Sequence, residues 1–267
     1  MAASRWSTFW RRTGRAFQDQ SRRIINMEGA ELPNRGPRLL YSFNTPEQAS
    51  DVVLGCDADV GGFSSVNFAL DTTSESERIG RPTGKFFGNL RLDVRPELVG
   101  RINSGYAGFK TEVRSTLFGK VTDNVYFHDY LALRVRAAGD PVLHKSYVVN
   151  VQTLDGMSHK TVWQQPLDIR RQDNDWETVY LPFSKFRVFT IGEPSPYLEY
   201  IDRENILTVG VAVLGGNHHA SGPYELGLDS IWVANEPDLV EDSPGPNTYT
   251  SENAADPSSL TDPEKTL

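Results

Sequence analysis

Cysteine is nearly missing from this chain of 267 residues, which contains Cys56 alone. An internal disulfide framework is therefore excluded, and the sequence holds no Asn-x-Ser/Thr glycosylation site either. Both absences favour a reducing or organellar compartment over secretion. No apolar run approaches the roughly 18 residues of a membrane-spanning helix. We therefore expect a soluble or peripheral protein.

Patterns that carry known chemistry are also scarce. The five histidines show no zinc-ligand spacing, and the chain has no G-x-S-x-G elbow, P-loop or helix-opening G-x-G-x-x-G. We expect no cofactor and no metal. In DADVGGFS, Asp57 and Asp59 resemble the start of a calcium loop, but position 61 is Gly and no matching Glu follows. We predict a turn in which Gly61 and Gly62 both take positive φ, and a calcium site of another type stays open. A glycosidase carboxylate pair also stays open, because its geometry depends on the fold.

Charge is unevenly distributed along the chain, whose net charge is −8. Residues 1–38 carry eight arginines against three acids, a net of +5, and residues 237–267 carry seven acids against one lysine, a net of −6. The remaining middle is therefore also acidic. Such a domain gives little reason to expect nucleic-acid binding, which needs a basic face.

The two ends differ in composition from the middle. Residues 1–37 are rich in Arg and Ser, and Trp6, Phe9, Trp10 and Phe17 fall at roughly helical spacing. This is typical of a mitochondrial transit peptide, and the alternative is a basic amphipathic helix on a membrane or a partner. Residues 237–267 are rich in Pro, Ser, Asp and Glu, which predicts a disordered acidic tail.

The middle, residues 38–236, has the pattern of an all-β domain. Short alternating runs broken by Gly, Pro, Asn and Asp predict an antiparallel sandwich or barrel. A short helix is predicted over 45–52, with Thr45 as N-cap and Pro46 at the first helical position, and another over 122–131. The predicted strands are 63–70, 84–94, 131–140, 146–153, 176–183, 205–215 and 224–236.

Aromatic residues suggest two surfaces. Trp163, Trp176, Trp232, Tyr106 and Tyr197 could form a sugar-stacking platform, although tryptophans in or beside strands more often pack in a core. The segment 186–200, FRVFTIGEPSPYLEY, is long and aromatic, and we interpret it as a partner-binding loop; the alternative is an ordinary crossover loop with its aromatic rings tucked in. Its candidate contact residues are Phe186, Phe189, Tyr197 and Tyr200.

Several blocks together resemble one known family. DVGGFSSVNF (59–68), FFGNLRLD (86–93), NSGYAGFKTEVRS (103–115), DYLALRVRAAGD (129–140), WETVYLPFSKFRVFTIG (176–192) and GPYELGLDSIWVANE (222–236) occur in this order. The series, which covers about residues 38–236, resembles the family of complex I intermediate-associated protein 30. That family assembles mitochondrial NADH:ubiquinone oxidoreductase.

The resemblance implies a jelly-roll β-sandwich similar to galactose-binding domains. It also implies a non-catalytic assembly chaperone in the mitochondrial matrix, peripheral to the inner membrane. The implied partners are membrane-arm subunits of complex I and other assembly factors, with no small-molecule substrate. The residues of the family pattern, which we interpret as fold-defining, are Gly61, Gly62, Ser64, Arg114, Trp176, Pro182, Phe183 and Asp229.

Asp229 lies where the alternation of the last strand slips. We predict a β-bulge that turns its carboxylate toward loop amides or toward Arg114 or Arg134. The chain has Gly227 where the family usually has an acid, so a ligand role for that acid is not expected here. Two other functions stay open: a carbohydrate-binding module and a hydrolase with paired carboxylates.

Overall fold

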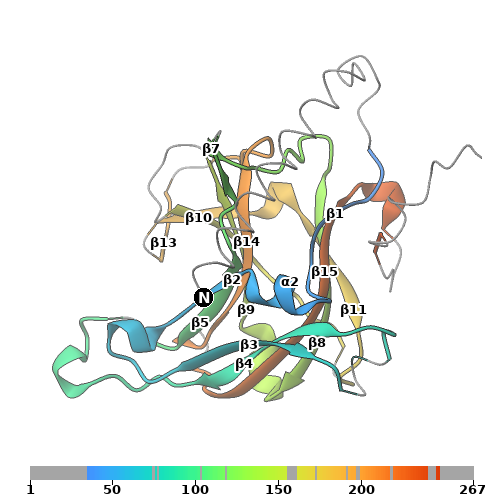
Figure 1. The fold of residues 1–267 in the computed structure, drawn as a ribbon. Helices are drawn as coiled ribbons and strands as arrows, with labels where there is room; N and C mark the ends of the chain where they lie inside the picture. Colours follow the sequence, from blue (N-terminus) through green and yellow to red (C-terminus); the bar gives the residue numbers. More distant parts are fainter. Residues whose placement is uncertain are drawn as a thin grey trace, which may run out of the picture.

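The computed structural model describes residues 35–239, except 74–75, 77, 103, 118, 155–160, 172, 191, 197–198 and 217–218, and also residues 245–246. The described residues form two antiparallel sheets that pack face to face (Figure 1). The predicted all-β sandwich is therefore confirmed. Residues 1–34 of the Arg-rich segment and most of the acidic tail lie outside the described residues.

One sheet contains six described strands in the order β11-β8-β15-β4-β3, with β1 also paired to β15. β15 is the longest strand and its pairing with β8 runs from Tyr224↔Gly139 to Ala234↔Tyr130. The strands are β1 (Arg38–Ser42), β3 (Ser65–Asp71), β4 (Thr83–Leu90), β8 (Tyr130–Gly139), β11 (Glu177–Pro182) and β15 (Gly222–Ala234).

The other sheet contains seven described strands in the order β13-β12-β10-β9-β14-β5-β2. Eight of the nine residues of its central strand, β14, are buried, as its nearly continuous apolar run predicts. The strands are β2 (Val52–Cys56), β5 (Tyr106–Thr111), β9 (Tyr147–Thr153), β10 (Thr161–Pro166), β12 (Arg187–Thr190), β13 (Glu193–Pro194) and β14 (Ile206–Leu214); β6 (Ser115–Thr116) and β7 (Gly119–Lys120) form a separate hairpin.

Helical structure is confined to short pieces in the described chain. α2 (Pro46–Ser50) begins with the predicted Thr45 cap, whose hydroxyl accepts from the Gln48 amide. The helix predicted over 122–131 is wrong, because Asp123 bridges Ile206 instead and Val125 donates its amide to the Arg203 carbonyl. The 3-10 turns are η1 (Asp57–Val60), η2 (Pro96–Leu98), η3 (Pro141–Lys145), η4 (Phe183–Lys185) and η6 (Glu236–Asp238).

The core fills the space between the sheets with the alternate side chains of both. At one end of it, aromatic rings pack against one another with centroids 4.9–6.1 Å apart. The aromatic and branched positions of the alternating runs face inward, because alternate side chains of a strand point to the same face of the sheet and pack there. The rings belong to Phe43, Phe68, Phe86, Phe109 and Tyr224.

Candidate functional site

The DADVGGFS stretch is held together by the buried carboxylate of Asp57. It accepts the Ser64 amide and hydroxyl at 2.8 and 2.9 Å and the Gly105 amide at 2.6 Å. Gly61 takes φ +110°, but Gly62 does not take positive φ, so the prediction for Gly62 is wrong. A Cβ at Gly62 would lie 2.4 Å from Asp57 Cγ, so the close approach of this carboxylate requires glycine there.

Asp229 sits at a bulge, as predicted, because the β15–β8 register shifts between Leu228 and Ser230. The predicted partners, Arg114 and Arg134, are wrong. Arg81 instead donates Nε and Nη2 to the fully buried carboxylate at 2.8 and 2.6 Å. Asn44 Nδ2 and the Ser230 hydroxyl complete the set at 2.9 and 3.0 Å. This carboxylate ties the loop before β4, through Arg81, and Asn44, which precedes the N-cap of α2, to β15.

Arg114 pairs with a different acid, Asp123, in the loop that leads toward β8. The Tyr41 hydroxyl also donates to Asp123 at 3.3 Å, and the guanidinium lies over the Tyr41 ring at 5.6 Å. Burial and the Asp123 charge raise the pKa of Tyr41. The arginine thus joins β1 to the loop beyond the β6–β7 hairpin.

Trp176 is buried beside Gly227, where a Cβ would lie 3.0 Å from the indole. Arg136 stacks over the same indole at 6.0 Å and donates to Glu225 at 3.0 Å. The indole therefore occupies the space that a side chain at position 227 would need, which accounts for the glycine that departs from the family pattern.

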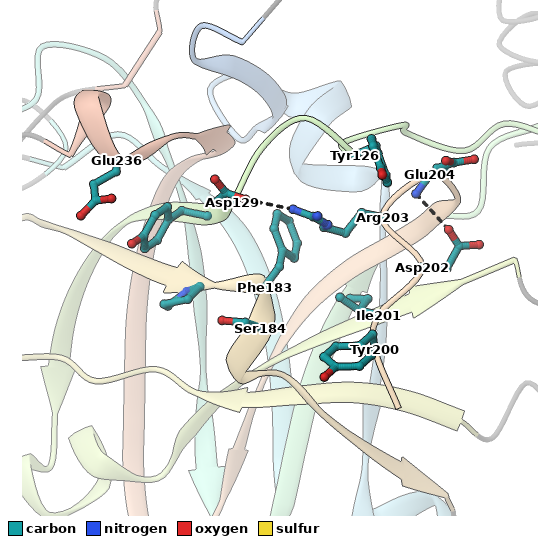
Figure 2. Close-up of a pocket in the computed structure, with 12 residues that line it drawn as sticks. Tyr126, Asp129, Phe183, Ser184, Tyr200, Ile201, Asp202, Arg203, Glu204 and Glu236 are labelled. Atoms are coloured by element: carbon teal, nitrogen blue, oxygen red, sulfur yellow. Dashed lines mark hydrogen bonds and ion pairs between the residues drawn. The ribbon is translucent and has the colours of Figure 1, made fainter. Parts of the chain in front are cut away.

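The described surface has a hollow of about 540 Å³ at one end of the sandwich (Figure 2). Its floor is formed by Pro182, Phe183 and Ser184, so two residues interpreted as fold-defining also face this site. We call it the acidic aromatic hollow. Its remaining lining residues are Tyr126, Asp129, Tyr130, Tyr200, Ile201, Asp202, Arg203, Glu204 and Glu236.

Four carboxylates line this hollow against one guanidinium, a net of −3. Arg203 already binds between Asp129, at 3.2 Å, and the Tyr126 ring, at 5.5 Å, and donates to the His128 carbonyl at 2.7 Å. The Asp202 carboxylate accepts the Glu204 amide at 3.0 Å. Carboxylates beside exposed aromatic faces are the groups that hold a cationic side chain.

Tyr126 and Tyr200 make the rim of the hollow accessible, with 50% and 81% of their surfaces exposed. Tyr126 also packs edge-on against Phe127, which is 42% exposed. Figure 2 shows Tyr200 and Arg203 along one side and Asp129 across from them. Exposed rings surrounded by polar groups are typical of a protein-binding surface.

The segment that starts the described chain lies next to this hollow. His128 Nε2 is 3.0 Å from the Gly36 carbonyl, and Asn235 Nδ2 donates to the Arg35 carbonyl at 2.7 Å. Burial lowers the pKa of His128, so the neutral ring is the form favoured here, and Nε2 donates to the carbonyl. Arg35 and Gly36 are therefore bonded to the residues that directly precede Glu236 and Asp129 in the chain.

The four predicted contact residues do not form one surface. Tyr200 lines the hollow, Phe186 is buried in the core against Phe183, and Phe189 lies half-buried on β12. Tyr197 lies outside the described residues. Sequence reasoning missed Tyr126 and the acids, because they come from three segments. The signal in the sequence that could have indicated this site is the run DNVYFHD (123–129), which places two aromatic residues between two acids.

The predicted sugar-stacking rings are mostly enclosed. Trp163, Trp176 and Trp232 have at most 4% of their surfaces exposed. Of the four described members of that set, Tyr106 alone lines the shallow apolar depression on the outer face of the seven-stranded sheet, beside Leu54 and Gln152. Within the part of the chain that the structure describes, no three His, Cys, Asp or Glu side chains are grouped to hold a metal ion, and no helix could span a bilayer.

The two antiparallel sheets define a β-sandwich protein. A family 11 carbohydrate-binding module from Clostridium thermocellum is similar, with 14% identity and a TM-score of 0.49 over 76% of this chain and 98% of that one. A family 30 module is similar with 13% identity and a TM-score of 0.38, over 77% and 86% of the two chains.

The sequence comparisons identify the family. The chain belongs to the complex I intermediate-associated protein 30 (CIA30) family, whose model matches residues 41–228. A relative from Neurospora crassa, "Complex I intermediate-associated protein 30, mitochondrial", is 27% identical over 252 residues. The match covers 86% of this chain and 85% of the relative. The family resemblance inferred from the sequence blocks is therefore confirmed.

Proposed function

We propose that the protein is a non-catalytic assembly factor for mitochondrial complex I. Membership of the CIA30 family, over residues 41–228, supports the assembly role. We further propose that it acts on membrane-arm intermediates together with other assembly factors. The single observation that supports a partner-docking surface on this protein is the acidic aromatic hollow, with its net charge of −3 and its two exposed tyrosines.

The hollow fits a protein partner better than a small molecule. It opens to solvent beside rings that are half-exposed or more, and its one guanidinium already shows how a cation is held between Asp129 and Tyr126. A lysine or arginine of a partner can bind the remaining carboxylates in the same way. Loops that flank membrane helices on the side of synthesis are rich in these residues.

The proposed location is the matrix, at the surface of the inner membrane. The Neurospora relative is named mitochondrial, and the Arg-rich segment 1–37 is consistent with import. A matrix location places the hollow on the side where loops of partly built membrane subunits are accessible.

Loss of the protein tests this function. In cells that lack it, native gels should show stalled membrane-arm intermediates while the matrix arm still forms, and the intact gene should restore assembly. The fully assembled complex at normal abundance in those cells would contradict the proposed function.

Carbohydrate binding is the less well supported function. The three tryptophans that would supply the largest stacking rings are buried in the sandwich. We therefore do not propose it, and retention of the protein by a glycan column would be the observation that reopens it.

A further inference from the structure

A second hollow lies on the other side of η4, and its charge is opposite. It measures about 260 Å³ and is lined by Lys145, Lys185 and Arg187, with no carboxylate in its lining. We call it the basic hollow. Its other lining residues are Ser146, Val148, Gln164, Pro166, Phe189 and Leu214.

Two turns and one strand bring the three cations together. η3 and η4 both end in lysine, at Lys145 and Lys185, and β12 follows η4 directly. Arg187, the first residue of β12, pairs with Gln164 of β10 toward the end of the seven-stranded sheet where β9 begins, two residues after Lys145. All three cations are exposed, and none of them forms an ion pair with another described residue.

A buried hydroxyl with no partner also lines this hollow. Ser146 is 2% exposed, and its Oγ has no hydrogen-bond partner among the described residues. A buried polar atom that lacks a partner destabilises the fold unless something else satisfies it. This oxygen is inaccessible, so the groups that can bind a phosphate oxygen here are the three exposed cations, which form no ion pair with another described residue.

The remaining walls are apolar. Val148, Pro166, Leu214 and the half-buried ring of Phe189 surround the cations. A free phosphate gains nothing from such walls, whereas a phospholipid has glycerol and acyl carbons beside its phosphate. Ligand sites usually measure about 300–1,000 Å³, so a hollow of 260 Å³ suits a headgroup better than a whole ligand.

We infer that the basic hollow binds the phosphate of an anionic phospholipid and places this edge of the sandwich on a membrane. The inference refines the proposed peripheral location and does not depend on complex I assembly. It also explains how a chain with a net charge of −8 could approach an anionic surface, since the contact is local.

Vesicle sedimentation of the full-length protein tests the site. The intact protein should bind phosphatidylglycerol vesicles, bind phosphatidylcholine vesicles weakly, and dissociate as salt increases. The triple variant Lys145→Gln, Lys185→Gln, Arg187→Gln should bind the anionic vesicles weaker by a factor on the order of a hundred, because each basic residue at such a surface contributes separately.

The matched control is Arg95→Gln, Lys120→Gln, Arg101→Gln. These three cations are also exposed, and the control variant loses the same three positive charges. Vesicle binding by the control variant should stay close to that of the intact protein. Equal binding by the two triple variants would overturn the proposal.

A fluorescent label next to the basic hollow distinguishes membrane binding at this site from membrane binding by the Arg-rich segment. Cys56 is the single cysteine and is buried, so a fluorophore attaches selectively to Thr190→Cys, next to Phe189. Its emission should shift on phosphatidylglycerol vesicles, whereas a label at the exposed Thr72→Cys, beside the other sheet, should not shift. A response of the 190 label to glycerol phosphate or a phosphopeptide, but not to vesicles, would refute the lipid source.

Discussion

Single buried carboxylates define the loops of this sandwich. Asp57 and Asp229 are both fully buried, and each accepts from several donors that lie far apart in the chain. The slip in alternation identified Asp229, whereas the sequence indicated Asp57 only as part of a stretch that resembles a calcium loop. The sequence did not identify Arg81 as the partner of Asp229, because 148 residues separate the two.

Replacing Asp229 by alanine should lower the free energy of unfolding by about 2–4 kcal/mol, since it removes the buried carboxylate that accepts from Arg81, Asn44 and Ser230. Chemical denaturation would measure the loss. Asp93 is a suitable control, because it also pairs with an arginine but its side chain is 67% exposed. Asp93→Ala should change stability by less than about 1 kcal/mol. Equal losses for the two variants would show that the Asp229 network is not a stabilising feature.

Short elements were predicted well where local signals decide them. The alternating runs located the strands, and Thr45 with Pro46 located α2. The helix expected over 122–131 does not form, because its backbone groups bond to residues 203–206 across the chain. Such a contact has no signature in a local window, and the acidic aromatic hollow depends on it.

The cap of α2 offers a test at this scale. Thr45→Ala should lower stability by about 1 kcal/mol, because it leaves the Gln48 amide without its side-chain acceptor. Ser50→Ala, at the exposed end of the same helix, should change stability by less than about 0.5 kcal/mol. A smaller effect at Thr45 than at Ser50 would contradict the cap.

The attachment of the chain before β1 should depend on pH. Burial lowers the pKa of His128 below its ordinary value of 6.5, so its contribution to stability is present above that pH. It is lost progressively as the pH falls below 6.5 toward the lowered value. Unfolding free energies of the intact protein and His128→Gln, measured across this range, should therefore differ in slope. Parallel pH profiles would exclude this contribution.

At the scale of the whole molecule, one short segment contributes residues to two hollows of opposite charge. η4 separates the acidic aromatic hollow, which contains Phe183, from the basic hollow, which contains Lys185. The sequence indicated the segment that follows η4, residues 186–200, as partner-binding because of its aromatic residues. It could not show that Phe186 faces inward, or that acids from three segments line one hollow with Tyr200, since only the fold brings them together.

Rescue of assembly in cells that lack the protein tests the central claim most directly. The variant Tyr200→Ala, Glu204→Lys, Glu236→Lys removes the rim ring and reverses two charges of the hollow. The matched control Leu117→Ala, Asp93→Lys, Glu97→Lys changes exposed residues elsewhere to the same extent. With both proteins folded and equally abundant, the control should restore the membrane arm, and the hollow variant should leave its intermediates stalled. Full rescue by the hollow variant would contradict docking at this site.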